Sequence, residues 1–245
     1  MGNLYNQLAA VYEAMYHTFI DYEAEYQFYS KILQEYNKSE VVEIGCGTGN
    51  LVPYFLENGF TYLGLDLSEN MVKIAKQKFP NGNFIVDDMR FFNLNQPVES
   101  IIITARTVSY LLENKDVIAT FQSLYNNIKT GGILAFDYID ANSFLPIVDK
   151  SEEITHKADY KGKHYVRKSD WKLHLEHNMS FKWNSTYFVK NENQLQELGQ
   201  DNSILRTFTC NEIELFLTLQ GFEIKAFIEK SSYAFPTFVV VAERV

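Results

Sequence analysis

Residues 43–50, Glu-Ile-Gly-Cys-Gly-Thr-Gly-Asn, have the residue types and spacing of a ligand-binding turn. Gly45, Gly47 and Gly49 follow a short apolar run and precede residues 50–57, which we expect to be helical. Glycine takes up turn conformations that other residues avoid and lets a ligand approach the backbone closely. The spacing is Gly-x-Gly-x-Gly and not the Gly-x-Gly-x-x-Gly of dinucleotide-binding turns, so it favours a ligand other than a dinucleotide pyrophosphate.

Acidic side chains end the next two apolar runs. Asp66 ends YLGLD, where a carboxylate can accept hydrogen bonds from both hydroxyls of a ribose. Ser68 is a suitable cap for the helix that follows, which leaves Asp66 for a ligand. Asp87 and Asp88 end NFIVDD, where either can accept from an adenine amino group while Met89 packs beside the ring. The alternative is that both are solvated loop carboxylates.

Strands and helices alternate between residues 40 and 140. The apolar runs VVEIG, TYLGLD, NFIV, SIIITA and ILAFDYI are separated by stretches of helical periodicity. This alternation predicts a mostly parallel sheet covered by helices on both faces. The tyrosine-rich residues 4–37 predict an amphipathic helix before the first strand. After residue 205, a helix at residues 210–219 precedes two apolar runs that we expect to be the last strands.

The rhythm changes between residues 140 and 205. Residues 171–183 alternate strictly between apolar and polar, which predicts one long half-buried strand in an antiparallel insertion. Its apolar face would carry Trp171, Leu173, Leu175, His177, Met179, Phe181 and Trp183. These aromatic residues suggest a partly apolar ligand or, alternatively, a core or dimer contact.

Charge and composition argue against several functions. Asp and Glu number 31 against 22 Lys and Arg, and the net charge of -9 opposes the phosphate neutralisation that nucleic-acid binding requires. Cys46 and Cys210, the two cysteines, are too few for a disulfide framework or a paired zinc spacing. We recognise neither a signal peptide nor an apolar run of membrane-spanning length. We therefore expect a cytoplasmic protein without membrane contact, either a monomer or a homodimer.

Together these residues resemble the class I S-adenosylmethionine-dependent methyltransferases, in particular their small-molecule branch. EIGCGTGN is similar to the family's glycine-rich turn, Asp66 to its ribose-binding acid, and Asp88-Met89 to its pair at the adenine. The resemblance implies S-adenosylmethionine as cofactor and S-adenosylhomocysteine as product. It also implies a doubly wound, mostly parallel seven-stranded α/β sheet whose last strand is antiparallel. The cofactor-binding residues that motif and position suggest are Tyr12, Glu43, Gly45, Cys46, Gly47, Gly49, Asp66, Leu67, Met71, Asp87, Asp88, Met89 and Arg106.

The resemblance further implies how a single domain is organised. Residues 1–36 would form an N-terminal helical lid, residues 37–140 and 205–245 the cofactor-binding core, and residues 141–204 an antiparallel β insertion covering the acceptor site. The expected reaction is in-line transfer of a methyl group to a nitrogen, oxygen or carboxylate of a small-molecule acceptor, without a metal. The alternatives are a non-catalytic S-adenosylmethionine-binding or nucleotide-binding protein and a nicotinamide-dependent oxidoreductase.

A general base is worth seeking because an oxygen or a protonated nitrogen nucleophile must lose a proton. His177 interrupts the apolar face of the predicted long strand and is one candidate, although a lone histidine there is more often a core residue. His17, in the presumed lid, is its rival. His174 and His177 would point to opposite faces, so we expect no metal site there. Tyr12 would contact the methionine part of the cofactor or pack in a helix core, and Arg106 would pair with a carboxylate or face solvent.

Overall fold

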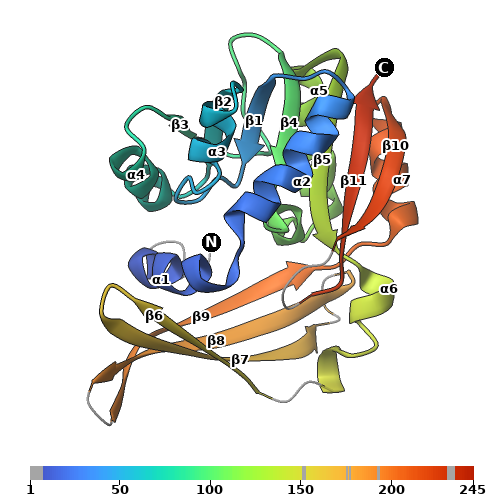
Figure 1. Ribbon diagram of the computed structural model, residues 1–245. Helices are drawn as coiled ribbons and strands as arrows, with labels where there is room; N and C mark the ends of the chain where they lie inside the picture. Colours follow the sequence, from blue (N-terminus) through green and yellow to red (C-terminus); the bar gives the residue numbers. More distant parts are fainter. Residues whose placement is uncertain (1–7, 151–152, 175, 177, 192–193, 231–234) are drawn as a thin grey trace.

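The computed structural model spans residues 1–245 and describes all of them except 1–7, 151–152, 175, 177, 192–193 and 231–234. Its strands form two sheets, and the N-terminal helix α1 (Ala9–Phe19) lies between them (Figure 1). The larger sheet has seven strands in the order β10-β11-β5-β4-β1-β2-β3, and the smaller has four strands in the order β6-β7-β8-β9.

The larger sheet is mostly parallel. Its strands are β1 (Glu40–Ile44), β2 (Thr61–Asp66), β3 (Asn83–Val86), β4 (Val98–Ile103), β5 (Ile128–Ile139), β10 (Phe222–Lys230) and β11 (Thr237–Arg244). β1 pairs in parallel with β2 and β4, β2 with β3, and β4 with β5. The last strand, β11, runs antiparallel to its neighbours β5 and β10. The doubly wound, mostly parallel seven-stranded sheet predicted from the sequence is therefore confirmed.

Helices cover both faces of this sheet. They are α2 (Tyr22–Glu35), α3 (Val52–Glu57), α4 (Glu69–Lys78), α5 (Asn114–Asn127) and α7 (Cys210–Leu219), with the short 3-10 helix η2 (Thr107–Tyr110). The short helices α6 (Ala141–Phe144) and η3 (Val148–Lys150) pack instead with residues of the smaller sheet. Val41 of β1 belongs to the same buried cluster as Leu33 of α2 and Phe55 of α3. Its neighbour Val42 belongs to the opposite cluster, with Phe121 of α5, because successive strand residues point to opposite faces. Of the helices that the structure describes, none combines the length and the apolar character needed to cross a bilayer.

Residues 171–183 do not form the single strand predicted from their alternation. They belong to two antiparallel strands, β7 (Lys163–His174) and β8 (Ser180–Asn191), in which Trp171 lies directly opposite Trp183. The chain reverses between them, where Asn178 has a φ of 36°, a conformation that asparagine tolerates. The prediction was wrong because directly opposed residues of a hairpin share a face, so the apolar alternation continues across the turn.

The two ends of this hairpin also differ from the predicted strand. Leu173, expected on the buried face, is 36% exposed, whereas His174, expected on the polar face, is only 7% exposed. The Ser180 hydroxyl donates a hydrogen bond to the backbone carbonyl of His174 at 2.6 Å and closes the hairpin. Leu175 and His177 lie outside the described residues.

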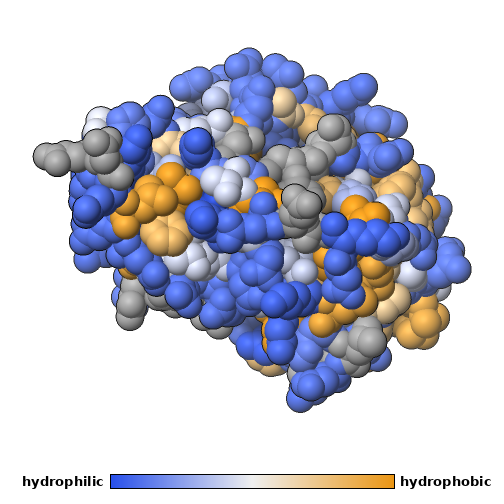
Figure 2. Space-filling model, turned by 90° about the horizontal axis from the view of Figure 1, so that it is seen from below, coloured by the Kyte–Doolittle hydropathy of each residue, from blue (hydrophilic) through white to orange (hydrophobic). Residues whose placement is uncertain are grey.

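The smaller sheet has an unexpectedly polar inner face. It is completed by β6 (Ile154–Tyr160) and β9 (Gln194–Arg206), and all its strand pairs are antiparallel. Tyr187 and Ala158 of this sheet pack in one cluster with Met15 of α1, which identifies the face turned towards α1. The same register places further polar residues on that face: His156, Arg167, Ser169, Ser185, Asp201 and Ser203. Figure 2, which views the molecule from the side of this sheet, shows a mainly hydrophilic outer surface with separate hydrophobic areas.

Candidate functional site

The glycine-rich turn lies between β1 and α3, at the carboxyl edge of the larger sheet. Gly45, Gly47 and Gly49 have φ angles of 76°, 53° and 77°, in the region that favours glycine. The backbone N–H groups of Gly45 and Cys46 both donate to the carbonyl of Leu65 in β2, at 2.8 and 3.1 Å. The sequence pattern therefore corresponds to a backbone that only glycine adopts readily, held against the neighbouring strand.

Asp66, at the end of β2, is fixed beside this turn by two backbone donors. Its Oδ2 accepts from the N–H of Gly47 and its Oδ1 from the N–H of Ser68, both at 2.8 Å. Burial raises the pKa of the Asp66 carboxyl, although these two hydrogen bonds oppose the shift. Ser68 caps α4 by accepting from the N–H of Met71 at 3.3 Å, as the sequence predicts. Each Asp66 oxygen retains lone-pair capacity for a ligand hydroxyl.

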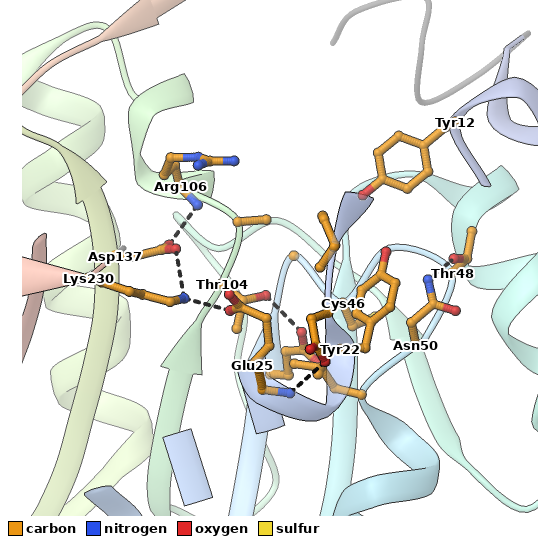
Figure 3. Close-up of a pocket in the computed structure, with 17 residues that line it drawn as sticks. Tyr12, Tyr22, Glu25, Cys46, Thr48, Asn50, Thr104, Arg106, Asp137 and Lys230 are labelled. Atoms are coloured by element: carbon orange, nitrogen blue, oxygen red, sulfur yellow. Dashed lines mark hydrogen bonds and ion pairs between the residues drawn. The ribbon is translucent and has the colours of Figure 1, made fainter. Parts of the chain in front are cut away.

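Two cavities meet at this edge of the sheet, one of about 260 Å³ and one of about 290 Å³. Tyr12, Gly45 and Ala105 line both, so the cavities are two parts of one ligand-binding region. Figure 3 shows the first, whose side chains come from α1, α2, the glycine-rich turn and the ends of β4, β5 and β10. The predicted cofactor residues that line one cavity or both are Tyr12, Glu43, Gly45, Cys46, Gly47, Asp66, Leu67, Asp87, Asp88, Met89 and Arg106.

Two predicted cofactor residues line neither cavity. Met71 is fully buried in α4, where its N–H bonds to the Ser68 cap. Gly49 packs against Phe84: a Cβ added there would lie 2.9 Å from the ring. Both residues pack in the interior next to the cavities. Their positions in the sequence could not distinguish such packing from contact with a ligand.

The carboxylate of Asp88 is already engaged by a neighbouring arginine. Arg90 donates to it through both Nε and Nη2, the latter at 2.6 Å, and reaches Asp116 through Nη1 at 3.3 Å. These hydrogen bonds from Arg90 lower the pKa of Asp88. Asp87 accepts the N–H of Asp88 at 2.8 Å. Sequence reasoning did not consider Arg90, although an arginine two residues after an aspartate was the available signal.

Glu43 is a buried carboxyl on the first cavity. It is 3% exposed and accepts hydrogen bonds from Tyr62 Oη at 2.5 Å and from Thr104 Oγ1 at 2.8 Å. Burial raises its pKa to about 7, against the effect of these two donors. Its charge therefore changes near neutral pH, at the cavity wall.

We expect Glu43 to make the folded state less stable as the pH rises. Its pKa is about 7 in the folded protein, against the ordinary value of 4.5 that applies in the unfolded chain. The stabilisation of the folded state by this carboxyl is therefore complete below pH 4.5 and is lost as the pH rises through about 7. The loss should be on the order of 3 kcal/mol. Urea unfolding of the wild type and of Glu43→Gln at several pH values between 4.5 and 7 measures how the difference in their free energies of unfolding depends on pH. A difference that does not change with pH would contradict the assignment.

A second polar cluster closes the other end of the first cavity. The Asp137 carboxylate accepts the backbone N–H of Arg106 at 2.6 Å and lies 3.7 Å from Lys230 Nζ (Figure 3). Lys230 Nζ also pairs with Glu25 Oε2 at 2.5 Å. The Arg106 side chain is 9% exposed, with its guanidinium 5.2 Å from the centre of the Phe235 ring, so it does not face solvent. An aspartate inside the apolar run ILAFDYI was the sequence signal for Asp137.

Helix α1 is joined to the glycine-rich turn by polar contacts. Glu13 accepts from Thr48 Oγ1 at 2.5 Å and forms an ion pair with Lys78 of α4. Lys78 also donates to Asn50 Oδ1 at 2.6 Å. Burial opposes ionisation of Glu13, but the hydrogen bonds from Lys78 and Thr48 lower its pKa. These contacts hold Tyr12, the residue before Glu13, over the cavities.

A smaller cavity of about 30 Å³ adjoins the other two. It lies between α1, the carboxyl edge of the larger sheet and the inner face of the smaller sheet. It is lined by Tyr12, Tyr16, Ala105, Arg106, Tyr110, Ile139, Trp183, Leu205 and Phe235. Tyr12, Ala105 and Arg106 connect it with the larger cavities, and the remaining lining is mainly aromatic.

Neither predicted catalytic histidine can be placed at these cavities. His17 is exposed on α1 and packs edge-on against Tyr160, with ring centres 5.8 Å apart. It lines none of the three cavities. His177 lies outside the described residues. Within the described part of the chain, no group of three or more His, Cys, Asp and Glu side chains is arranged to hold a metal ion.

Comparison with known proteins identifies the family. A family described as "Methyltransferase domain" matches residues 41–132. A putative methyltransferase of Bacillus subtilis, YqeM, is 28% identical over 232 residues, which cover 90% of this chain and 87% of the relative. An uncharacterized methyltransferase of Bacillus mycoides is 32% identical over 176 residues, 68% of this chain and 80% of the relative. The structure of CalS10, an amino pentose methyltransferase from Micromonospora echinaspora with S-adenosylmethionine bound, has a TM-score of 0.78 at 20% identity, covering 96% of this chain and 97% of that one.

The chain belongs to the class I S-adenosylmethionine-dependent methyltransferases. Its cofactor is S-adenosylmethionine, which donates the methyl group. The residues present fit this cation, because the two larger cavities are lined mainly by carboxylates among their charged groups: Asp21, Glu25, Glu43, Asp66, Asp87, Asp88, Asp116 and Asp137.

Proposed function

We propose that this methyltransferase transfers the methyl group to an amino group of a small molecule bound between α1 and the two sheets. The observation that carries this proposal is the aromatic cavity, which shares Tyr12 and Ala105 with both larger cavities. A cofactor lying across the larger cavities would present its methyl group towards this space. In-line transfer requires the nucleophile, the methyl carbon and the sulfur to be aligned and water to be excluded, and a mainly aromatic lining supports the exclusion of water.

In this proposal the cofactor's two halves occupy different cavities. In the cavity of about 290 Å³, Asp66 accepts from the ribose hydroxyls, and Asp88 and Met89 lie beside the adenine. Glu43 and the turn from Gly45 to Gly49 face the methionine half. Residues 1–36 act as the lid, residues 37–140 and 205–245 as the cofactor-binding core, and residues 141–204 as the insertion that covers the acceptor.

An amino acceptor suits the groups that line the aromatic cavity. Methylation of an amine places a positive charge on nitrogen, and the ring faces of tyrosine, tryptophan and phenylalanine stabilise such a charge. Before the reaction the amine must be neutral, and the nearby Arg106 guanidinium disfavours protonation of an adjacent nitrogen. The similarity to CalS10, an amino pentose methyltransferase, further supports an amino acceptor.

The proposal is tested by measuring release of S-adenosylhomocysteine with matched pairs of small molecules. Each pair has the same carbon skeleton, carrying an amino group in one member and a hydroxyl group in the other. We expect turnover with amino members and none with their hydroxyl partners. Turnover of hydroxyl members alone would overturn the amino acceptor and assign an oxygen nucleophile, while a protein that binds S-adenosylmethionine but methylates neither class would contradict the proposal.

A further inference from the structure

The backbone and the side chain of Arg90 both hold the Asp88 carboxylate. The backbone N–H of Arg90 donates to Oδ1 of Asp88 at 3.0 Å. Its Nε lies 3.0 and 3.1 Å from the two carboxylate oxygens, and its Nη2 donates to Oδ2 at 2.6 Å. Paired contacts between a guanidinium and a carboxylate are planar and specify geometry more strictly than a single contact does. The orientation of the Asp88 carboxylate is therefore fixed.

The same guanidinium reaches the opposite wall of the cavity. Its Nη1 donates to Asp116, in the first turn of α5, at 3.3 Å. Asp88, Arg90 and Asp116 all line the cavity of about 290 Å³, together with Asp66 and Met89. Because two carboxylates balance the charge of Arg90, this residue does not need an anionic ligand. Its contacts instead join the segment after β3 to α5 across the cavity.

These contacts leave Asp88 little capacity for a further hydrogen bond. A carboxylate has about four lone-pair sites, and three N–H groups of Arg90 already donate to this one, so room remains for one more donor. The hydrogen bonds from Arg90 also lower the pKa of Asp88, so the group is ionised at neutral pH. An ionised carboxylate accepts hydrogen bonds but cannot donate them. The remaining site therefore suits an amino group and disfavours a carbonyl oxygen.

We propose that Arg90 is a positioning residue that makes the adenine end of the site selective for a purine with an exocyclic amino group. This inference rests on the proposed function, which places the adenine beside Asp88. Arg90 acts through Asp88, because it turns the last acceptor position of the carboxylate towards the amino group. A purine with a carbonyl oxygen at that position would set two acceptors against each other and leave the carboxylate unpaired, which costs affinity.

Calorimetry on the full chain tests this inference with two ligands, S-adenosylhomocysteine and S-inosylhomocysteine. The second has a carbonyl oxygen in place of the exocyclic amino group. We expect the wild type to bind S-adenosylhomocysteine at least about tenfold more tightly, because S-inosylhomocysteine loses a charge-assisted hydrogen bond. Arg90→Gln should reduce this ratio to about threefold or less, since the carboxylate is free to rotate. The ratio is the decisive readout, because a purely structural role of Arg90 would weaken both ligands equally.

Arg90→Lys is a second variant that disturbs the loop less. Lysine keeps the positive charge but lacks the planar fork of donors, so this variant should also lose most of the ratio. An unchanged ratio in Arg90→Gln, a full ratio in Arg90→Lys, or a wild type without any preference would each overturn the role of Arg90.

Arg244→Gln is the matched control for loss of an arginine. Arg244 of β11 donates to the backbone carbonyl of Ile128, its guanidinium lies 4.2 Å from the centre of the Tyr125 ring, and it lines none of the three cavities. Both affinities should stay unchanged in this variant, and a reduced ratio there would contradict the specific role of Arg90.

Asp88→Ala separates failure of this inference from failure of the proposed function. If Asp88→Ala keeps the wild-type ratio, the adenine does not lie at Asp88 and that part of the proposed function is wrong. If Asp88→Ala loses the ratio while Arg90→Gln keeps it, the adenine assignment stands and only the role of Arg90 is overturned. Loss of the ratio in both variants is the expected result.

Discussion

Replacing Asp66 by alanine should weaken the binding of S-adenosylmethionine by roughly ten- to a hundredfold, the equivalent of about 1.5–3 kcal/mol for hydrogen bonds to a charged group. In the proposed complex the carboxylate accepts from the ribose hydroxyls. It also accepts from the N–H groups of Gly47 and Ser68, so the substitution removes the hydrogen bonds that hold the glycine-rich turn and the start of α4 beside it. Calorimetric titration of each protein with S-adenosylmethionine measures the effect.

Ser68→Ala is the control for disturbance of α4. It removes the helix cap but leaves the Asp66 carboxylate and its bond to Gly47. We expect it to lower the free energy of unfolding by about 0.5–2 kcal/mol, with affinity nearly unchanged. If Ser68→Ala weakens cofactor binding as much as Asp66→Ala, the start of α4 matters and the ribose assignment fails.

Gly45→Ala should destabilise the protein by roughly 2–5 kcal/mol and abolish measurable cofactor binding. An alanine at a φ of 76° adopts the left-handed conformation, at a cost of about 1–2 kcal/mol. Its Cβ would also overlap the hydroxyl oxygen of Thr107. That hydroxyl donates to the carbonyl of Thr104 at 2.7 Å, which restricts its movement, and overpacking of this kind adds about 1–3 kcal/mol. Urea unfolding and calorimetry measure the two effects.

Gly59→Ala separates the conformational cost from the overlap. Gly59 has a φ of 81°, but a Cβ there would meet no atom within 4 Å. It should therefore cost only about 1–2 kcal/mol and leave cofactor binding intact. Adding Thr107→Ala to Gly45→Ala should recover part of the lost stability, because the overlapping hydroxyl is removed. Equal losses at Gly45 and Gly59 would rule out Thr107 as the reason that glycine is required.

The sequence was informative wherever the deciding interactions are local. The glycine-rich turn lies between β1 and α3, and Asp66 and Ser68 lie between β2 and α4, so each belongs to a single strand-turn-helix unit and could be predicted from residue types and spacing. Glycine, aspartate and serine have strong conformational preferences at such positions. The contacts of Asp66 also follow from neighbouring strands, since parallel strands bring their carboxyl ends to one edge.

The sequence was misleading where a property depends on pairing between strands. The alternation of residues 171–183 fitted a single strand because Trp171 and Trp183 share a face in a hairpin as they would in one strand. The same alternation drew attention to the aromatic residues on the inner face of the smaller sheet, Trp171 and Trp183. The polar residues of that face, such as Arg167, are placed by strand register and by the packing of α1.

By itself, the sequence determined the doubly wound fold and the family, and it predicted where the cofactor binds, because hydrophobic periodicity and a glycine-rich turn are local signals. Only the tertiary structure placed Asp137, Lys230 and Glu25 together, although they lie on three elements far apart in the chain. It likewise joined Arg90 to Asp116 and left Gly49 and Met71 outside the cavity walls. Burial and long-range contact decide which charged groups meet, and neither is encoded in the spacing of residues along the chain.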